Sequence, residues 1–569
     1  MKQILFTFLL FLVTHQATAS LRLPRLMPFE LKADITNYTL GGNGTFDQYL
    51  DHDNPHLGTF KQWFWYNTTW WGGPGSPVYL FTPGEIDGAS HTGWLTEWSL
   101  IGKYAQLTGG ATVMLEHRYF GESTPFSVLD TQNLTYLTLK NSLADFAHFA
   151  QTVKLPFDTT GKSSPENAPW TFIGGSYAGM LSAWMQKFHP GIFWAFHSSS
   201  APVQAIYKFW NYFTPIEKGM PRNCSDDALL IADHLNAVYS RGLEAEIHDL
   251  KDMFGLAELE HFDDFAMELG MQFVAWQGIS PSTGYSRIFE MCDTIEGARD
   301  VPISVVYLNE TTTTVATRNP ATSSLYPSDD RKFPTGFTSG IGLEKALANF
   351  AAWYKNKVLP GACSYGYPEW ADPLSVACRN THNASSPMYT DWSSVRKGGY
   401  PYAREWNWML CNEPFAFWMG GPPSSHRGLM SHVVTPEFQQ RQCRLWFPPA
   451  PDGTLYGSAN GVRTVDTVNR LTGGWNPTNT TRVIWTAGEF DPWRHGSVTS
   501  PDRPGGPMIS TPANPVFLIP GAVHGNELRM ANGDANAEIR AVQEASIEIM
   551  KQWVADYYTA RDNQTSTKE

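Results

Sequence analysis

The sequence predicts an α/β protein with one parallel sheet, interrupted late in the chain by a large helical insertion. Two observations carry this prediction. Between residues 77 and 198, short apolar runs alternate with amphipathic stretches, which is the pattern of parallel strands joined by crossover helices. From about residue 206 to 460 the pattern is helix-like and broken by Pro, Ser and Thr loops, and strand-like runs return only near residue 482.

Six short apolar runs are the expected core strands: residues 77–82, 111–116, 170–174, 193–198, 482–486 and 515–519. Helices are expected after a cap at Asn141-Ser142 and over 177–188, 226–239 and 343–358, with a last amphipathic helix near the end of the chain. We therefore predict a first part of the core over 20–205, a helical cap over 206–460 and a second part of the core over 461–560.

The N-terminus has the order of a secretory signal peptide. Lys2 precedes an apolar run over residues 4–13, and Ala17-Thr18-Ala19 offers a cleavage site after Ala19. The run is too short to cross roughly 30 Å of hydrocarbon, so we expect no membrane anchor here. Residues 1–19 thus predict secretion, or delivery to a vacuolar or lysosomal lumen.

The composition is that of a globular and acidic protein, with 42% apolar residues, 17% charged residues and a formal net charge of −13. No Lys/Arg-rich block is present, and the acidic balance argues against a nucleic-acid partner. Nine sequons of the form Asn-x-Ser/Thr fit a glycosylated secreted protein: Asn37, Asn43, Asn67, Asn133, Asn223, Asn309, Asn383, Asn479 and Asn563.

All six cysteines lie within the predicted cap: Cys224, Cys292, Cys363, Cys378, Cys411 and Cys443. An even number in an oxidising compartment predicts three disulfides. Several pairings are open, and we favour sequence neighbours, 224 with 292, 363 with 378, and 411 with 443. No Cys-x-x-Cys or His-Glu-x-x-His pattern occurs, so no metal site is expected.

The third expected strand ends in Gly174-Gly175-Ser176-Tyr177-Ala178-Gly179, and a helix is expected at once. A serine on a tight strand-to-helix turn holds its Oγ out of the sheet, which is the geometry of a nucleophile elbow. The strict Gly-x-Ser-x-Gly pattern has Gly where this chain has Ala178. The strand–turn–helix context still favours Ser176 as a nucleophile.

A serine nucleophile needs a base and an orienting acid, and in an α/β-hydrolase these follow later strands in the order Ser, Asp or Glu, His. The strand at 482–486 leads to Asp491, and the strand at 515–519 leads to His524. Glu489 is the alternative acid. His524 could also be an ordinary surface histidine, but it directly follows the last expected strand.

The backbone N–H of Tyr177, which follows the nucleophile, is expected to stabilise the oxyanion. Gly72-Gly73-Pro74-Gly75 precedes its strand and so lies at the wrong end of the sheet. Pro83-Gly84-Glu85 follows that strand, and Gly84 is therefore the candidate for the second donor. Neither a metal nor an organic cofactor is needed for this chemistry.

Four segments together resemble the proline-specific serine peptidases, the family of lysosomal Pro-Xaa carboxypeptidase, dipeptidyl peptidase II and secreted fungal prolyl endoproteases. They are Gly174 to Gly179 with Met180, Glu116-His117-Arg118-Tyr119-Phe120-Gly121, Asp491-Pro492-Trp493, and Gly521-Ala522-Val523-His524. The resemblance covers most of the chain from about Phe46. It implies an α/β-hydrolase core with a disulfide-bearing helical cap between the sixth and seventh strands.

The resemblance also implies site residues. Ser176, Asp491 and His524 correspond to the nucleophile, acid and base, while Met180 and Trp493 resemble walls of the pocket for the residue before the cleaved bond (S1). From the residues alone, both side chains would be assigned to packing. This chain departs from relatives at Ala178, where Gly or Ser is common, and at Val523, where several carry a second histidine.

These observations predict hydrolysis of proline-containing peptides or proteins on the carboxyl side of proline, with alanine as a second choice. Whether the enzyme cuts internally or near a terminus stays open, as does its oligomeric state. An esterase or lipase on the same core is the enzymatic alternative. A catalytically inactive binding protein on this scaffold is the non-enzymatic one.

Overall fold

The computed structural model describes residues 41–297, 340–394, 403–450, 452–456, 461, 463–477 and 480–566, so the signal peptide expected at 1–19 lies outside the described residues. An eight-stranded sheet forms the centre, with its strands in the order β1-β2-β4-β3-β5-β6-β9-β10. The strands are β1 Gly42–Tyr49, β2 Thr59–Asn67, β3 Val78–Phe81, β4 Ala111–Leu115, β5 Trp170–Gly175, β6 Ala195–Ser199, β9 Val483–Gly488 and β10 Val516–Ile519. Every pair from β4 to β10 is parallel.

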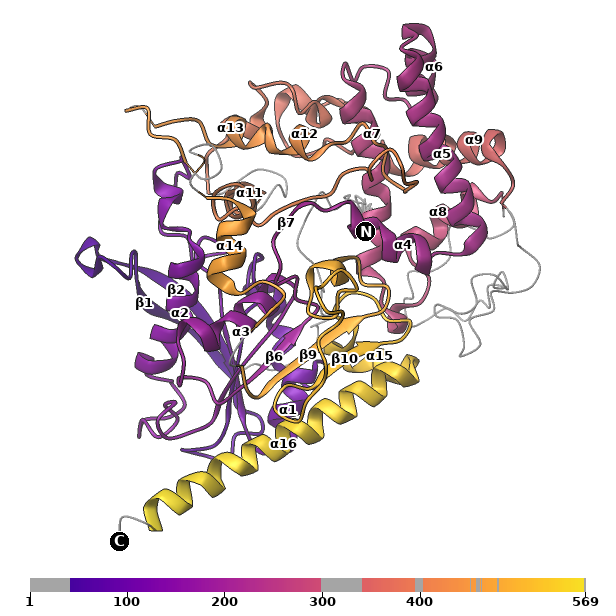
Figure 1. The fold of residues 1–569 in the computed structure, drawn as a ribbon. Coiled ribbons are helices and arrows are strands. Elements are labelled where there is room, and N and C mark those ends of the chain that lie inside the picture. The colour runs from indigo at the N-terminus through magenta and orange to yellow at the C-terminus, as the bar shows by residue number, and fades with distance from the viewer. Residues whose placement is uncertain are drawn as a thin grey trace, which may run out of the picture.

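Helices cover both faces of the sheet (Figure 1). On one face α1 (Leu100–Thr108) and α16 (Ala537–Ser566) pack on a cluster that includes Tyr79 and Ile173. On the other face α2 (Leu139–Thr152) and α3 (Tyr177–Phe188) pack on Leu80 and Phe172. Side chains of one strand alternate between the two clusters because successive residues point to opposite faces. A parallel sheet covered on both faces is the predicted α/β architecture.

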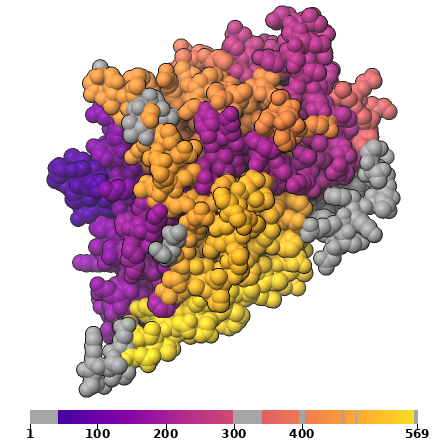
Figure 2. Space-filling view, viewed as in Figure 1, coloured from indigo at the N-terminus to yellow at the C-terminus, as the bar shows by residue number. Residues whose placement is uncertain are grey.

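The insertion lies between β6 and β9, the sixth and seventh strands of this sheet in chain order, and covers the upper part of the view in Figures 1 and 2. Its helices are α4 Phe213–Gly219, α5 Arg222–Arg241, α6 Glu244–Met253, α7 Phe262–Gly270, α8 Arg287–Ile295, α9 Leu343–Trp353, α10 Pro387–Thr390, α11 Ala403–Asn412, α12 Pro436–Gln440, α13 Gln442–Trp446 and α14 Val465–Thr472. The insertion also contains two short strands, β7 (Ile206–Lys208) and β8 (Ala416–Trp418), which pair with each other. The last core helices are α15 (Met530–Ala535) and α16.

Three disulfides cross-link segments of the cap. As expected, each joins two cysteines that follow one another in the sequence: Cys224–Cys292, Cys363–Cys378 and Cys411–Cys443. The first ties α5 to α8, and the third ties α11 to α13. They close loops inside the cap, where the irregular chain between short helices has much entropy to lose.

The structure corrects several expected boundaries. Residues before 77 form two antiparallel strands, β1 and β2, that the sequence analysis did not predict. The polar residues of β1 gave it no apolar run. Helix α2 begins at Leu139 because Thr138, not Asn141, accepts the capping hydrogen bond. The expected helix over 343–358 is α9 followed by a π-helical turn, Tyr354–Val358. None of the described helices combines the length and apolar character that a membrane crossing requires.

Candidate active site

Ser176 lies at the tight turn between β5 and α3, as the sequence predicts. Its backbone has φ of 58° and ψ of −128°, a strained conformation for a residue with a side chain. The Ser176 N–H donates to the Ser199 carbonyl at 2.9 Å, which ties the turn to the end of β6. Ser176 is partly exposed, whereas Tyr177 after it is buried. The turn thus presents Ser176 above the carboxyl edge of the sheet.

The turn is tight because two glycines allow close backbone approach. A Cβ at Gly174 would lie 2.1 Å from the Ala178 carbonyl oxygen, and one at Gly179 would lie 2.7 Å from the Ser199 oxygen. Position 178 is not one of the crowded ones, since the methyl group of Ala178 fits against Gly84. The departure from the strict motif at Ala178 therefore leaves the elbow intact.

Asp491 and His524 meet after β9 and β10. His524 Nδ1 donates to Asp491 Oδ1 at 2.8 Å, and both side chains are buried. A histidine that donates from Nδ1 to a carboxylate carries its lone pair on Nε2, the tautomer that a general base requires. The alternative acid Glu489 instead accepts the Gly521 N–H at 2.9 Å. Asp491 is thus the carboxylate that the structure joins to His524.

The histidine loop is tied to the end of β6, next to the serine turn. The Gly525 N–H donates to Ser200 Oγ at 2.8 Å. The buried carboxylate of Glu527 accepts hydrogen bonds from the hydroxyls of Ser199 and Thr486, on β6 and β9. These bonds hold the loops after β5, β6, β9 and β10 at one edge of the sheet, where α/β proteins form their sites.

The expected oxyanion donors, Tyr177 and Gly84, lie in adjacent segments. A Cβ at Gly84 would lie 3.5 Å from the Ala178 nitrogen and 3.7 Å from the Tyr177 ring, so the loop after β3 reaches the start of α3. The Gly84 N–H, however, donates to Thr82 Oγ1 at 3.2 Å. A role for Gly84 as second donor therefore requires this long bond to be exchanged for one to the developing oxyanion.

Trp493 stands in an aromatic cluster beside His524, with 6.4 Å between the two ring centroids. Three rings surround the indole at centroid distances of 5.3 to 5.5 Å: Phe209, Tyr212 and Phe417. Sequence reasoning missed these three residues, although the aromatic density of 207–213 and 415–418 is a signal for them. Met180 is buried in the same large core, one turn after Ser176 on α3.

One stretch of the cap contacts the loops of both the acid and the base. Trp276 Nε1 donates to the Phe490 carbonyl at 2.9 Å, next to Asp491. Gln277 Oε1 accepts from Trp493 Nε1 and from the Tyr212 hydroxyl, each at 2.9 Å. The Ile279 carbonyl accepts from Asn526 Nδ2, two residues after His524, also at 2.9 Å. The cap is therefore part of the site.

The expected glycosylation sites differ in accessibility. Asn43, Asn383 and Asn563 are exposed, and Asn133 is half-buried. The side chains of Asn67 and Asn223 are buried, which disfavours a glycan at these two positions in the folded chain. Asn37, Asn309 and Asn479 lie outside the described residues.

One group of potential metal ligands lies on the cap, formed by His261, Asp263 and His382. The two imidazoles are stacked face to face, with centroids 3.6 Å apart and an interplanar angle of 22°. His382 Nε2 is hydrogen-bonded to the Asp263 carboxylate. We therefore assign no metal to this group.

Comparison with known proteins identifies the family of this chain. The model of the serine carboxypeptidase S28 family matches residues 48–258 and 369–545. Serine protease vicPa of Bipolaris victoriae is 39% identical over 95% of this chain and 93% of its own. The lysosomal Pro-X carboxypeptidase of Bos taurus is 23% identical over 96% and 94%, and a probable extracellular serine carboxypeptidase of Arthroderma benhamiae is 27% identical over 87% and 64%.

The α/β-hydrolase core and these relatives together define a serine-type peptidase. The family match spans more than half of the chain and includes the core on both sides of the cap and parts of the cap itself. The chain belongs to the serine carboxypeptidase S28 family.

Proposed function

We propose that this peptidase cleaves on the carboxyl side of proline, through an acyl-enzyme on Ser176. In this mechanism His524 Nε2 takes the proton of Ser176 as Oγ attacks the carbonyl carbon. Asp491 stabilises the imidazolium through Nδ1, and the Tyr177 N–H stabilises the oxyanion. The imidazolium then protonates the leaving amine, and water attacks the acyl-enzyme with His524 again as base.

The observation that carries the proline specificity is the aromatic cluster around Trp493. A proline ring has no polar group to bind and packs well on an aromatic face. Trp493 is two residues after the proposed acid and 6.4 Å from the ring of the proposed base, so a side chain bound on its face lies close to the reacting carbonyl. Met180, one turn after the nucleophile, is the proposed second wall.

The relatives support the same reading of substrate and location. The Bos taurus relative is named as lysosomal and as acting on Pro-X bonds, and the Arthroderma benhamiae relative is named as extracellular. With the signal sequence expected at residues 1–19, these names favour secretion or delivery to a lysosomal or vacuolar lumen. Both destinations are reached through the oxidising ER lumen, where three disulfides can form.

The experiment is mass-spectrometric mapping of cleavage in a mixed peptide library between pH 4 and 7, with Ser176→Ala as control. Cuts after proline that vanish in Ser176→Ala are the expected result, and the alanine variant should lose roughly 10⁶-fold in kcat. The distance of the cuts from each terminus distinguishes endopeptidase from exopeptidase. Cuts that ignore proline, or that persist in Ser176→Ala, contradict the proposal.

A second assay covers the esterase alternative, because the same core can hold other acyl substrates. Hydrolysis of short p-nitrophenyl esters without any peptide cleavage would replace the peptidase proposal with the esterase one. Failure of Ser176 to react with a fluorophosphonate would indicate an inactive binding protein.

A further inference from the structure

The segment Glu116-His117-Arg118 follows β4 and takes no part in the proposed chemistry, yet all three side chains are fully buried. Burying three ionisable side chains costs free energy of folding unless each has hydrogen-bond or ion-pair partners. Each of the three contacts a different part of the fold.

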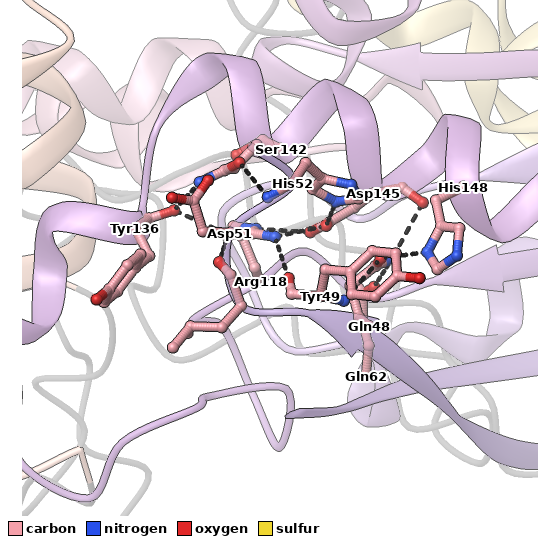
Figure 3. Close-up of polar contacts among 12 residues, drawn as sticks. Gln48, Tyr49, Asp51, His52, Gln62, Arg118, Tyr136, Ser142, Asp145 and His148 are labelled. Atoms are coloured by element: carbon pink, nitrogen blue, oxygen red, sulfur yellow. Dashed lines mark hydrogen bonds and ion pairs between the residues drawn. The ribbon is translucent and has the colours of Figure 1, made fainter. Parts of the chain in front are cut away.

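Arg118 anchors the segment to α2 and to the N-terminal strands, as Figure 3 shows. Its guanidinium makes a bidentate pair with Asp145 of α2, at 2.6 and 2.7 Å. The remaining N–H groups donate to the carbonyl oxygens of Tyr49, Leu50 and Tyr136. Burial raises the pKa of Asp145, but the charge and hydrogen bonds of Arg118 outweigh burial and keep it below its usual value. The segment is thereby rigidly held.

Glu116 anchors the loop after β3, which contains Gly84. Its Oε1 accepts the Gly88 N–H at 2.7 Å, and its Oε2 accepts the N–H and hydroxyl of Ser123 at 2.9 and 2.6 Å. Gly121 makes room for this carboxyl group, since a Cβ there would lie 1.9 Å from Glu116 Oε1. Residues 83–88 are therefore fixed at their far end by Glu116.

His117 anchors Tyr177. Its Nδ1 lies 2.8 Å from the Arg118 carbonyl, which can only accept, so Nδ1 carries the proton. Nε2 then accepts from the Tyr177 hydroxyl at 3.1 Å. Burial lowers the pKa of His117 to about 4, which keeps this imidazole neutral and able to accept. His117 thus holds the hydroxyl end of the tyrosine whose N–H is the proposed oxyanion donor.

We propose that Glu116 and His117 are positioning residues that set the two sides of the oxyanion hole, with Arg118 holding both in place. Glu116 acts through Gly88 on the loop that contains Gly84, and His117 acts through the hydroxyl on the Tyr177 backbone. This inference rests on the proposed function. It adds a role for a segment that the triad leaves unexplained.

The test is a double-mutant cycle of His117→Phe and Tyr177→Phe. Both single variants should lower kcat by roughly 10- to 100-fold with KM nearly unchanged, because a displaced donor weakens binding of the transition state only. A peptidyl prolyl boronic acid, whose adduct with Ser176 mimics the tetrahedral intermediate, should lose affinity in parallel. The double variant should be no worse than the single ones, since both remove one interaction. His117→Gln should retain activity, because its amide oxygen can accept from Tyr177.

Tyr104→Phe is the matched control. The Tyr104 hydroxyl bonds Nδ1 of the buried His197 at 2.9 Å, in the core cluster on the α16 side of the sheet. Tyr104→Phe should lower the melting temperature about as much as Tyr177→Phe does, without changing kcat. Unchanged kcat and boronate affinity in Tyr177→Phe overturn the inference, and this variant decides alone if His117→Phe does not fold. The reaction of the wild type with a fluorophosphonate is measured first. A wild type that does not react contradicts the proposed function and not the role of His117.

Discussion

One carboxylate oxygen of Asp491 accepts two hydrogen bonds: from His524 Nδ1 at 2.8 Å and from the backbone N–H of Trp493 at 2.9 Å. The first orients the proposed base, and the second fixes the start of the turn that carries the proposed S1 wall. Orientation of the base and placement of the aromatic face therefore depend on the same atom. A change at Asp491 should affect both.

Asp491→Asn should lower kcat/KM by roughly 10⁴-fold, because an amide in place of the carboxylate favours the wrong imidazole tautomer. Initial rates on a proline peptide, with circular dichroism to verify folding, provide the measurement. Glu489→Gln is the control, since Glu489 accepts from the Gly521 N–H and should change the rate little. A larger loss in Glu489→Gln than in Asp491→Asn would reverse the assignment of the acid.

Gln277→Met should reduce discrimination for proline, because it removes the one acceptor shared by Trp493 Nε1 and the Tyr212 hydroxyl. The indole then loses its fixed orientation, and we expect KM for proline peptides to rise by about 10-fold, the scale of one lost hydrogen bond. The ratio of kcat/KM for proline and alanine substrates reports this. Gln272→Met is the matched control, since Gln272 bonds Glu268 within the cap. Equal ratios in both variants would contradict the role of Gln277.

Glu85→Gln should remove part of the dependence of stability on pH. Burial raises the pKa of Glu85 from 4.5 to about 8. Between these values the folded protein keeps a proton that the unfolded chain releases, so this group stabilises the fold fully below about pH 4.5 and the contribution is lost as pH rises to 8. Urea unfolding from pH 4 to 9 should show a flatter profile in Glu85→Gln than in wild type. The exposed Glu258→Gln should match wild type, and an unchanged slope in Glu85→Gln would refute the burial of an uncharged Glu85.

Glycans should be found on exposed sequons and not on buried ones. Asn43, Asn383 and Asn563 are exposed, whereas Asn67 is buried and donates its amide to the Leu95 carbonyl at 2.9 Å. A glycan attached there before folding would block the packing at the end of β2. Peptide mapping of protein from a secretory host, with and without glycosidase, measures occupancy. Glycan on Asn67 or Asn223 of active enzyme would contradict the packing described.

The amino-acid sequence predicted the core strands from residue 77 onward, their interruption by a cap, and the places of Ser176, Asp491 and His524 after three of those strands. These features are local: a strand, its turn and the residue after it lie within about ten residues of one another in the printed sequence. For the disulfides the sequence left other pairings open, and the structure has the favoured one between sequence neighbours. The sequence favoured Asp491 but kept Glu489 as an alternative, and the hydrogen bond to His524 Nδ1 distinguishes the two.

The identity of the distant residues that complete the site depends on how the chain packs. Gln277 and Trp276 reach Trp493 and Phe490 across more than two hundred residues, and His117 reaches Tyr177 across 60. No periodicity encodes such contacts, because they depend on how the cap packs on the core and on where buried polar groups find partners. The burial of Asn67 likewise follows from packing. The sequence thus predicts the catalytic chemistry, and the packing of the fold determines which residues support it.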